Sequence, residues 1–128
     1  MRILGIDYGK KKIGLALAEG PLSEPWKVIR FENIDDVVEE LSDLVESESI
    51  NKVVVGISEN KMGEESKRFS LSLSKRLTIP VATFDETLTT YEAQKLAIEA
   101  GIGRKKRKEM EDAYAASLML QLYLDSNV

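Results

Sequence analysis

Carboxylates are the side chains of this sequence best suited to catalysis, because the chain has no cysteine and no histidine. Thiolate nucleophiles, cysteine zinc sites and the commonest general base are therefore excluded, and the remaining candidates are carboxylates, Lys, Ser, Thr and Tyr. Two hard divalent ions about 4 Å apart can activate a water, neutralise a phosphate and stabilise the leaving oxygen, and Mg²⁺ requires oxygen ligands. Three carboxylates from separate elements would suffice to hold such ions. The residue types thus favour metal-assisted hydrolysis of a phosphodiester.

Asp7 is the best candidate ligand from its position alone, because it ends an apolar run beside a glycine turn, with Lys10 and Lys11 near a prospective phosphate. An Asp-x-Gly turn is, however, as often a simple hairpin cap. Glu86 follows another apolar run, but acids just before a helix also interact well with the helix dipole. Asp112 lies with other acids in an expected first helical turn, where acids are ordinary, and its spacing does not single it out. The residues alone leave these alternatives open.

Basic residues are clustered despite the net charge of -4. Eight of the 22 acids lie between Glu32 and Glu48, where there is no Lys or Arg, so the rest of the chain has 18 basic and 14 acidic residues. Clustered cations attract a phosphate backbone, and each cluster is also explained as a solvated helix face or loop. The clusters nearest the candidate acids are the expected nucleic-acid contacts. Their residues are Lys10, Lys11 and Lys12, and Arg104, Lys105, Lys106 and Arg107.

Short apolar runs, alternating residues and helical spacing, together with cap signals, predict five strands and four helices along the chain. The third strand is expected to begin after a loop that contains Pro21 and Pro25. The helix after the last strand is expected to start with a capping box and to end at a glycine. The expected strands are 2–7, 12–18, 26–31, 52–57 and 80–85, and the expected helices are 34–45, 64–77, 89–101 and 110–124.

This element order predicts an α/β fold with a mixed five-stranded sheet, in which an antiparallel hairpin meander joins two parallel strands and helices cover both faces. Ligands in such sheets gather near the carboxyl ends of adjacent parallel strands, where Asp7 and Glu86 would meet. The 128 residues, with 43% hydrophobic content, predict one domain spanning 1–128. No apolar stretch is long enough for a membrane span and no signal peptide is visible, so we expect a cytoplasmic protein that does not bind membranes.

Four ordered segments carry a resemblance to a known family. They are Gly5 to Ala16 (GIDYGKKKIGLA), Val54 to Gly56 (VVG), Asp85 to Thr90 (DETLTT) and Asp112 to Ala116 (DAYAA). The sequence resembles the YqgF/RuvX family over nearly its whole length, and the first segment is the most specific. Members of that family have the ribonuclease H-like fold, and they are described as Holliday junction resolvases and as nucleases that mature the 5′ end of pre-16S ribosomal RNA.

The resemblance implies a role for each of three acids. By this similarity Asp7 is the metal ligand of the first strand, Glu86 is the acid that follows the last parallel strand, and Asp112 is the acid on the final helix. Mg²⁺ or Mn²⁺ is the implied cofactor, and structured RNA or branched DNA is the implied partner. The same three acids are therefore the expected catalytic residues.

Two departures from the family pattern concern the substrate more than the metal site. The family usually continues Val-Gly with Leu-Pro and a later Asp-Gly, whereas this chain has Ile57-Ser58 and Met62-Gly63. The family also commonly has Arg where Thr87 stands. A cation that would contact phosphate is missing there, and the basic clusters are the candidates to replace it.

Four functions compete on this sequence. The first is a two-metal nuclease, a hydrolase acting on ester bonds, that processes pre-16S rRNA in ribosome biogenesis. A Holliday junction resolvase would use the same chemistry but generally needs two active sites, and the sequence does not distinguish a monomer from a homodimer. An actin-like or sugar-kinase-like phosphotransferase also uses an Asp-x-Gly hairpin, but it holds its nucleotide between two such domains. A non-catalytic nucleic-acid-binding module would keep the fold without cleavage, and the presence of all three acids favours an enzyme over it.

Overall fold

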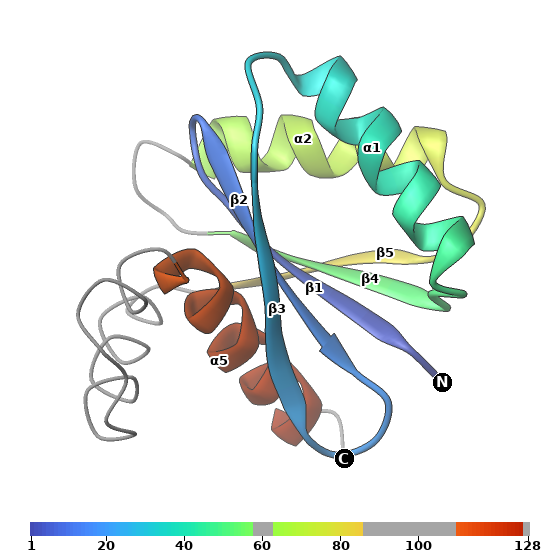
Figure 1. Ribbon diagram of the computed structural model, residues 1–128, viewed down its shortest axis with the longest axis vertical. Coiled ribbons are helices and arrows are strands. Elements are labelled where there is room, and N and C mark those ends of the chain that lie inside the picture. The colour runs from blue at the N-terminus through green and yellow to red at the C-terminus, as the bar shows by residue number, and fades with distance from the viewer. Residues whose placement is uncertain (58–62, 86–109, 127–128) are drawn as a thin grey trace.

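A five-stranded mixed sheet forms the framework of the protein (Figure 1). The computed structural model describes residues 1–57, 63–85 and 110–126. β1 pairs antiparallel with β2 and parallel with β4, so it is the central strand. The predicted hairpin meander and the two parallel strands are confirmed. The strands are β1 (Ile3–Tyr8), β2 (Lys12–Ala18), β3 (Ser23–Arg30), β4 (Lys52–Ile57) and β5 (Val81–Asp85), in the order β3-β2-β1-β4-β5.

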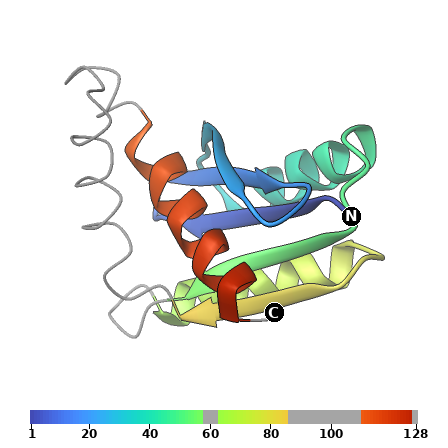
Figure 2. The same cartoon turned by 90° about the horizontal axis from the view of Figure 1, so that it is seen from below.

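Helices lie on both faces of the sheet, as the element order predicts. α1 (Ile34–Ser47) and α2 (Gly63–Arg76) pack on one face, and α5 (Glu111–Ser126) crosses the other (Figures 1 and 2). The helix predicted at 89–101 lies outside the described residues. Within the described part of the chain, no helix is long and apolar enough to cross a membrane.

The face covered by α1 and α2 contains the larger hydrophobic core. Phe69 and Leu73 of α2 are fully buried, which confirms the four-residue spacing read from the sequence. They share one cluster with Leu41 of α1 and with Leu4 and Ile6 of β1. Alternate residues of β1 therefore point toward these two helices, and the residues between them point toward α5.

The face covered by α5 has small residues in the sheet. Gly5 of β1 lies under the helix, and a Cβ added there would be 3.0 Å from the Cβ of Leu120. Ala16 and Ala18 of β2 are buried in the same cluster as Leu120 and Met119. Since these strand residues are short, the axis of α5 can approach the sheet closely. This approach brings the first turn of α5 down to the strands.

The third strand begins earlier than predicted. Pro25 was expected in a loop, but it lies inside β3 and pairs with Ala16. A proline lacks the N–H that a strand ladder needs, and it is tolerated here because β3 is an edge strand. The register also shifts between Leu15 and Ala16, as at a β-bulge. The predicted boundary was therefore wrong, because the sequence pattern did not reveal that this strand is at the edge.

Candidate active site

Asp7 lies near the carboxyl end of the central strand and faces α5. It pairs with Gly14 of β2 on one side and with Gly56 of β4 on the other, so its direct partner in each neighbouring strand has no side chain. The residue is only 8% exposed. A buried carboxylate is costly unless hydrogen-bond donors or cations satisfy it. The strand positions thus hold one nearly buried acid near the carboxyl end of the central strand.

The first turn of α5 packs directly on Gly14. A Cβ added to this glycine would be 2.7 Å from the backbone nitrogen of Ala113, and it would collide with the carbonyl group of Asp112. Only a residue without a side chain allows the helix to begin here. Because Gly14 is the direct partner of Asp7, the helix start is fixed one strand away from that acid.

Asp112 therefore lies at the same end and on the same face of the sheet as Asp7. Its carboxylate forms an ion pair with Lys12, whose Nζ is 3.1 Å from Oδ2. Both side chains are partly exposed, at 40% for Lys12 and 24% for Asp112. The structure brings together two of the three acids expected from the sequence, and it holds a positive charge next to the second one.

The third acid and the second basic cluster lie outside the described residues. Glu86 directly follows Asp85, the last residue of β5. The residues from Arg104 to Arg107 lie a few positions before Glu111, the first residue of α5, in the sequence. Among the described residues, no group of three or more acids could hold a metal ion.

The first basic cluster forms the tip of the β1–β2 hairpin beside these acids. Gly9 makes the turn, and a Cβ added to it would be 2.5 Å from the carbonyl oxygen of Lys12. Lys10 and Lys11 are exposed at the tip. The carbonyl oxygen of Lys11 accepts a 3.0 Å hydrogen bond from the backbone N–H of Phe31, which ties the tip to the chain after β3. The predicted cations are thus mounted on a fixed turn near Asp7.

Tyr8 follows Asp7 in the sequence but belongs to the opposite face. Its ring packs against Phe69 with centroids 4.7 Å apart and against Phe31 at 5.9 Å. Burial, assisted by the negative charge of Glu65, raises the pKa of the Tyr8 hydroxyl. This tyrosine is therefore a neutral part of the core, and it is not a candidate acid or base for the site around Asp7.

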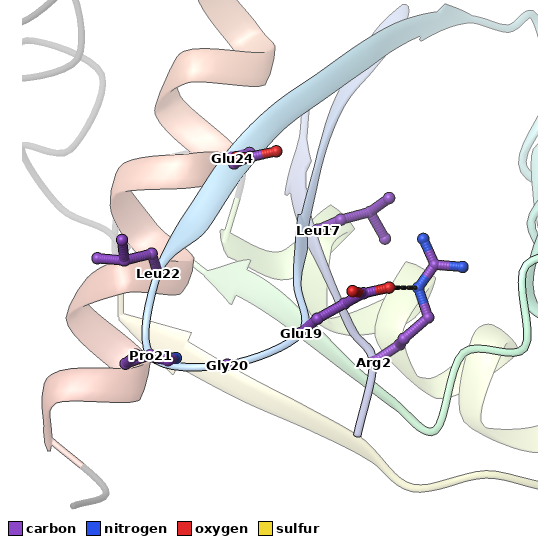
Figure 3. Close-up of a pocket in the computed structure, with 7 residues that line it drawn as sticks. All are labelled: Arg2, Leu17, Glu19, Gly20, Pro21, Leu22 and Glu24. Atoms are coloured by element: carbon purple, nitrogen blue, oxygen red, sulfur yellow. Dashed lines mark ion pairs between the residues drawn. The ribbon is translucent and has the colours of Figure 1, made fainter.

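A separate pocket of about 390 Å³ lies at the other end of the sheet (Figure 3). It is lined by Arg2 at the start of β1 and by the β2–β3 turn. The guanidinium of Arg2 is 2.8 Å from a carboxylate oxygen of Glu19, and its Nη1 donates to the carbonyl oxygen of Glu48. The charge of Arg2 is thus already paired with Glu19. The pocket lies at the opposite end of β1 from Asp7.

Sequence reasoning missed the glycines that shape the site. Gly14 and Gly56 stand on either side of Asp7 only because of the strand register, which no local pattern reveals. A hint was present for Gly14, which the segment KIGLA places in a strand, where glycine commonly marks a close backbone approach. The position of Asp112 depends on this same approach.

Comparison with known proteins gives concordant matches. A family model described as "RuvX: Holliday junction resolvase" matches residues 1–126. A "Putative pre-16S rRNA nuclease" of Pelotomaculum thermopropionicum is 40% identical over 135 residues, covering 98% of this chain and 88% of the relative. A Bacillus subtilis protein with the same name is 38% identical over 136 residues, covering 98% and 99%.

Two solved structures have a similar fold over the whole chain. Thermus thermophilus RuvC in complex with a Holliday junction substrate gives a TM-score of 0.66 at 16% identity, covering 100% of this chain and 97% of RuvC. The Fowlpox virus resolvase in complex with junction DNA gives 0.67 at 11% identity, covering 100% and 99%. At such identities the likeness concerns the fold alone, and it confirms the expected ribonuclease H-like architecture.

Proposed function

Because this chain belongs to the RuvX family, we propose that it is a nuclease that hydrolyses phosphodiester bonds with divalent metal ions held by Asp7, Glu86 and Asp112. The observation that carries this proposal is the placement of Asp7 and Asp112 at one end of one face of the sheet. Glu86 joins them in the proposal because it directly follows β5, which is parallel to β4 and ends at the same side.

The described part of the site fits a divalent cation. Its donors are carboxylate oxygens, which suit Mg²⁺ or Mn²⁺, and the chain has no cysteine or histidine that would favour a softer metal. Asp7 is nearly buried, and its direct partners in the two adjacent strands are glycines without side chains. The ammonium of Lys12 already sits against Asp112, which supports a preference of this acid for positive charge.

The two acids would hold the metal ions, and the lysines of the hairpin tip would orient the nucleic acid. Asp7 is held in position because its strand is paired with β2 on one side and with β4 on the other. Asp112 is held in position because the first turn of α5 packs on Gly14. Lys10 and Lys11 at the exposed hairpin tip bind phosphate oxygens and orient the nucleic-acid backbone toward these acids. When bound, the divalent ions supply charge neutralisation at the phosphate and activation of water.

Pre-16S ribosomal RNA is the substrate that we propose first. Relatives that are 35–40% identical over 98–100% of this chain are named "Putative pre-16S rRNA nuclease". Such processing takes place where ribosomes are made, which favours a cytoplasmic protein. A four-way DNA junction is the second candidate, because it is the substrate in the description of the family. Symmetric cutting of a junction generally requires two active sites, so a monomer would favour RNA.

A parallel cleavage assay tests the function. The protein is incubated with Mg²⁺ or Mn²⁺ and, separately, with a precursor rRNA fragment, a four-way DNA junction and linear controls of each. We expect wild-type cleavage of at least one structured substrate and loss of cleavage in Asp7→Asn, Glu86→Gln and Asp112→Asn. The matched control is Asp43→Asn, the same chemical change at an exposed position of α1. This control should retain full activity.

The folding of each variant is followed by circular dichroism and urea unfolding, because loss of activity through unfolding would be uninformative. We expect cooperative unfolding in all variants, since replacing an acid of the cluster by its amide relieves carboxylate repulsion. Cleavage by Asp7→Asn within a few-fold of the wild-type rate would remove Asp7 from the proposed site. Full activity in excess EDTA would contradict the metal mechanism as a whole.

A further inference from the structure

Arg30, the last residue of β3, stands directly opposite Lys12 in the sheet. The two residues are Cα partners in the antiparallel ladder between β2 and β3. Partners in such a ladder have their Cα atoms about 5 Å apart and their side chains on the same face. Lys12 reaches Asp112 at the start of α5, so Arg30 also lies on the face of the sheet that carries the two acids.

The neighbours of Arg30 confirm this orientation. Ile29 is buried in the core under α1 and α2, which is the opposite face. Residues alternate along a strand, so Arg30 must point away from that core. It is exposed at the edge of the sheet, beyond Lys12 as seen from Asp7. From β1 to the edge of the sheet, this face therefore carries Asp7, then Lys12 on β2 and then Arg30 on β3.

Among the described residues Arg30 has no ion-pair partner, which distinguishes it from two other arginines. Arg76 pairs with Glu39 at 2.6 Å, and Arg2 pairs with Glu19 at 2.8 Å. Like charges directly opposite each other destabilise a strand pair. Asp112 compensates Lys12, but the described structure offers no such compensation for Arg30. The position of Arg30 opposite Lys12 therefore does not stabilise the described fold, and this favours a binding partner of Arg30 that carries negative charge.

We propose that Arg30 binds a backbone phosphate of the nucleic acid, on the strand that leads away from the cleaved bond across the β2–β3 edge. This inference rests on the proposed function and extends it, because it gives the path of the substrate relative to the acids. The planar guanidinium of arginine suits a phosphate, with which it forms two parallel hydrogen bonds. Lys12 lies between Arg30 and Asp112, so the phosphate at Arg30 belongs to a nucleotide flanking the site.

Binding measurements across a salt series test the proposal. The background is the Asp7→Asn protein, which should bind without cutting, and the probes are a fluorescent precursor rRNA fragment and a four-way DNA junction. Arg30→Gln should weaken binding roughly tenfold at low salt, the effect of one lost charge-assisted contact. The slope of log K against log salt should flatten by about 0.7 to 0.9. Arg30→Lys should keep that slope, because its charge is retained.

Lys75→Gln is the matched control, since Lys75 is an exposed cation in the last turn of α2, on the other face of the sheet. It should leave affinity and slope unchanged. Thermal unfolding separates binding from a structural role: Arg30→Gln should unfold at or above the parent's melting temperature, because it removes a like-charge pair. A purely protective charge on an edge strand predicts aggregation with unchanged binding instead.

The outcomes distinguish this inference from the function on which it rests. An Arg30→Gln protein with the parent's affinity and slope overturns the role of Arg30 and leaves the proposed function intact. An Asp7→Asn protein that binds neither probe, at any salt concentration, contradicts the proposed function and this inference with it. A lowered melting temperature with an unchanged salt slope would assign Arg30 to the fold alone.

Discussion

Replacing Gly14 by alanine should damage both the stability of the fold and the geometry of the acids. The added Cβ would be 2.7 Å from the backbone nitrogen of Ala113, which is 0.7 Å inside the 3.4 Å at which ordinary contact begins. The carbonyl carbon and oxygen of Asp112 would be closer still. These are backbone atoms that cannot rotate away. The first turn of α5 must therefore retreat from the sheet by more than 0.7 Å.

The size of the effect follows from this displacement. Overpacking a well-packed site costs about 1–3 kcal/mol, and the upper part of that range is expected because the clash involves backbone. A misplacement of about 1 Å in a catalytic group can cost on the order of 100-fold in rate. We therefore expect Gly14→Ala to lose about 2–3 kcal/mol in the free energy of unfolding. Its cleavage rate should fall roughly 100-fold under conditions where the protein is still folded.

Urea unfolding and single-turnover cleavage measure the two effects separately. Gly20→Ala is the matched control, because a Cβ added at Gly20 has no atom within 4 Å. That variant should behave as the wild type in both assays. A Gly14→Ala protein with wild-type stability and cleavage would refute the argument that this glycine sets the position of Asp112.

Three further predictions concern charge. The hydrogen bond from Arg76 lowers the pKa of Glu39 below its usual value, so this pair should stabilise the fold at neutral pH and lose its effect as the pH falls through the lowered pKa. Urea unfolding of Glu39→Gln and of the wild type should show a small difference in stability at pH 7 and none at pH 3. Replacing Lys105, Lys106 and Arg107 by Ser should flatten the salt slope of binding by about 2, at roughly 0.7 per contact to a single strand, and should lower the rate at saturating substrate much less; an unchanged slope would make these residues merely solubilising. Ca²⁺ should support binding far better than turnover, because its looser coordination positions the attacking water poorly, and equal rates in Ca²⁺ and Mg²⁺ would contradict this.

Local patterns were sufficient for most of the described elements. The four-residue spacing of Phe69 and Leu73 predicted α2 to within one residue at each end, and two short apolar runs separated by a turn at Gly9 predicted the hairpin of β1 and β2. An amphipathic helix can be recognised from the period of its buried residues, and a buried strand from a short apolar run that ends at turn residues. Pro25 was misplaced because tolerance of proline depends on whether a strand is at the edge, which is a property of the whole sheet.

The site was less accessible to such reasoning than the fold. Asp7 was identified from its strand end and turn, but Asp112 has the sequence surroundings of any acid at a helix start. Its position depends on the contact of α5 with Gly14, which joins residues far apart in the chain. Only the family resemblance pointed to it. Arg30 was not selected at all, since its relation to Lys12 comes from the pairing register.

Because α5 packs on Gly14 of β2, Asp7 and Asp112 can come together only after α5 has been synthesised. Asp7 emerges with the first strand, whereas Asp112 belongs to the last helix. At about 5–20 residues per second, the growing chain carries the first acid for roughly 5 to 20 seconds before the second has been made. The pair can form only after the last helix has left the ribosome and docked. The incomplete chain therefore lacks the second acid of the proposed site until most of the chain has been synthesised.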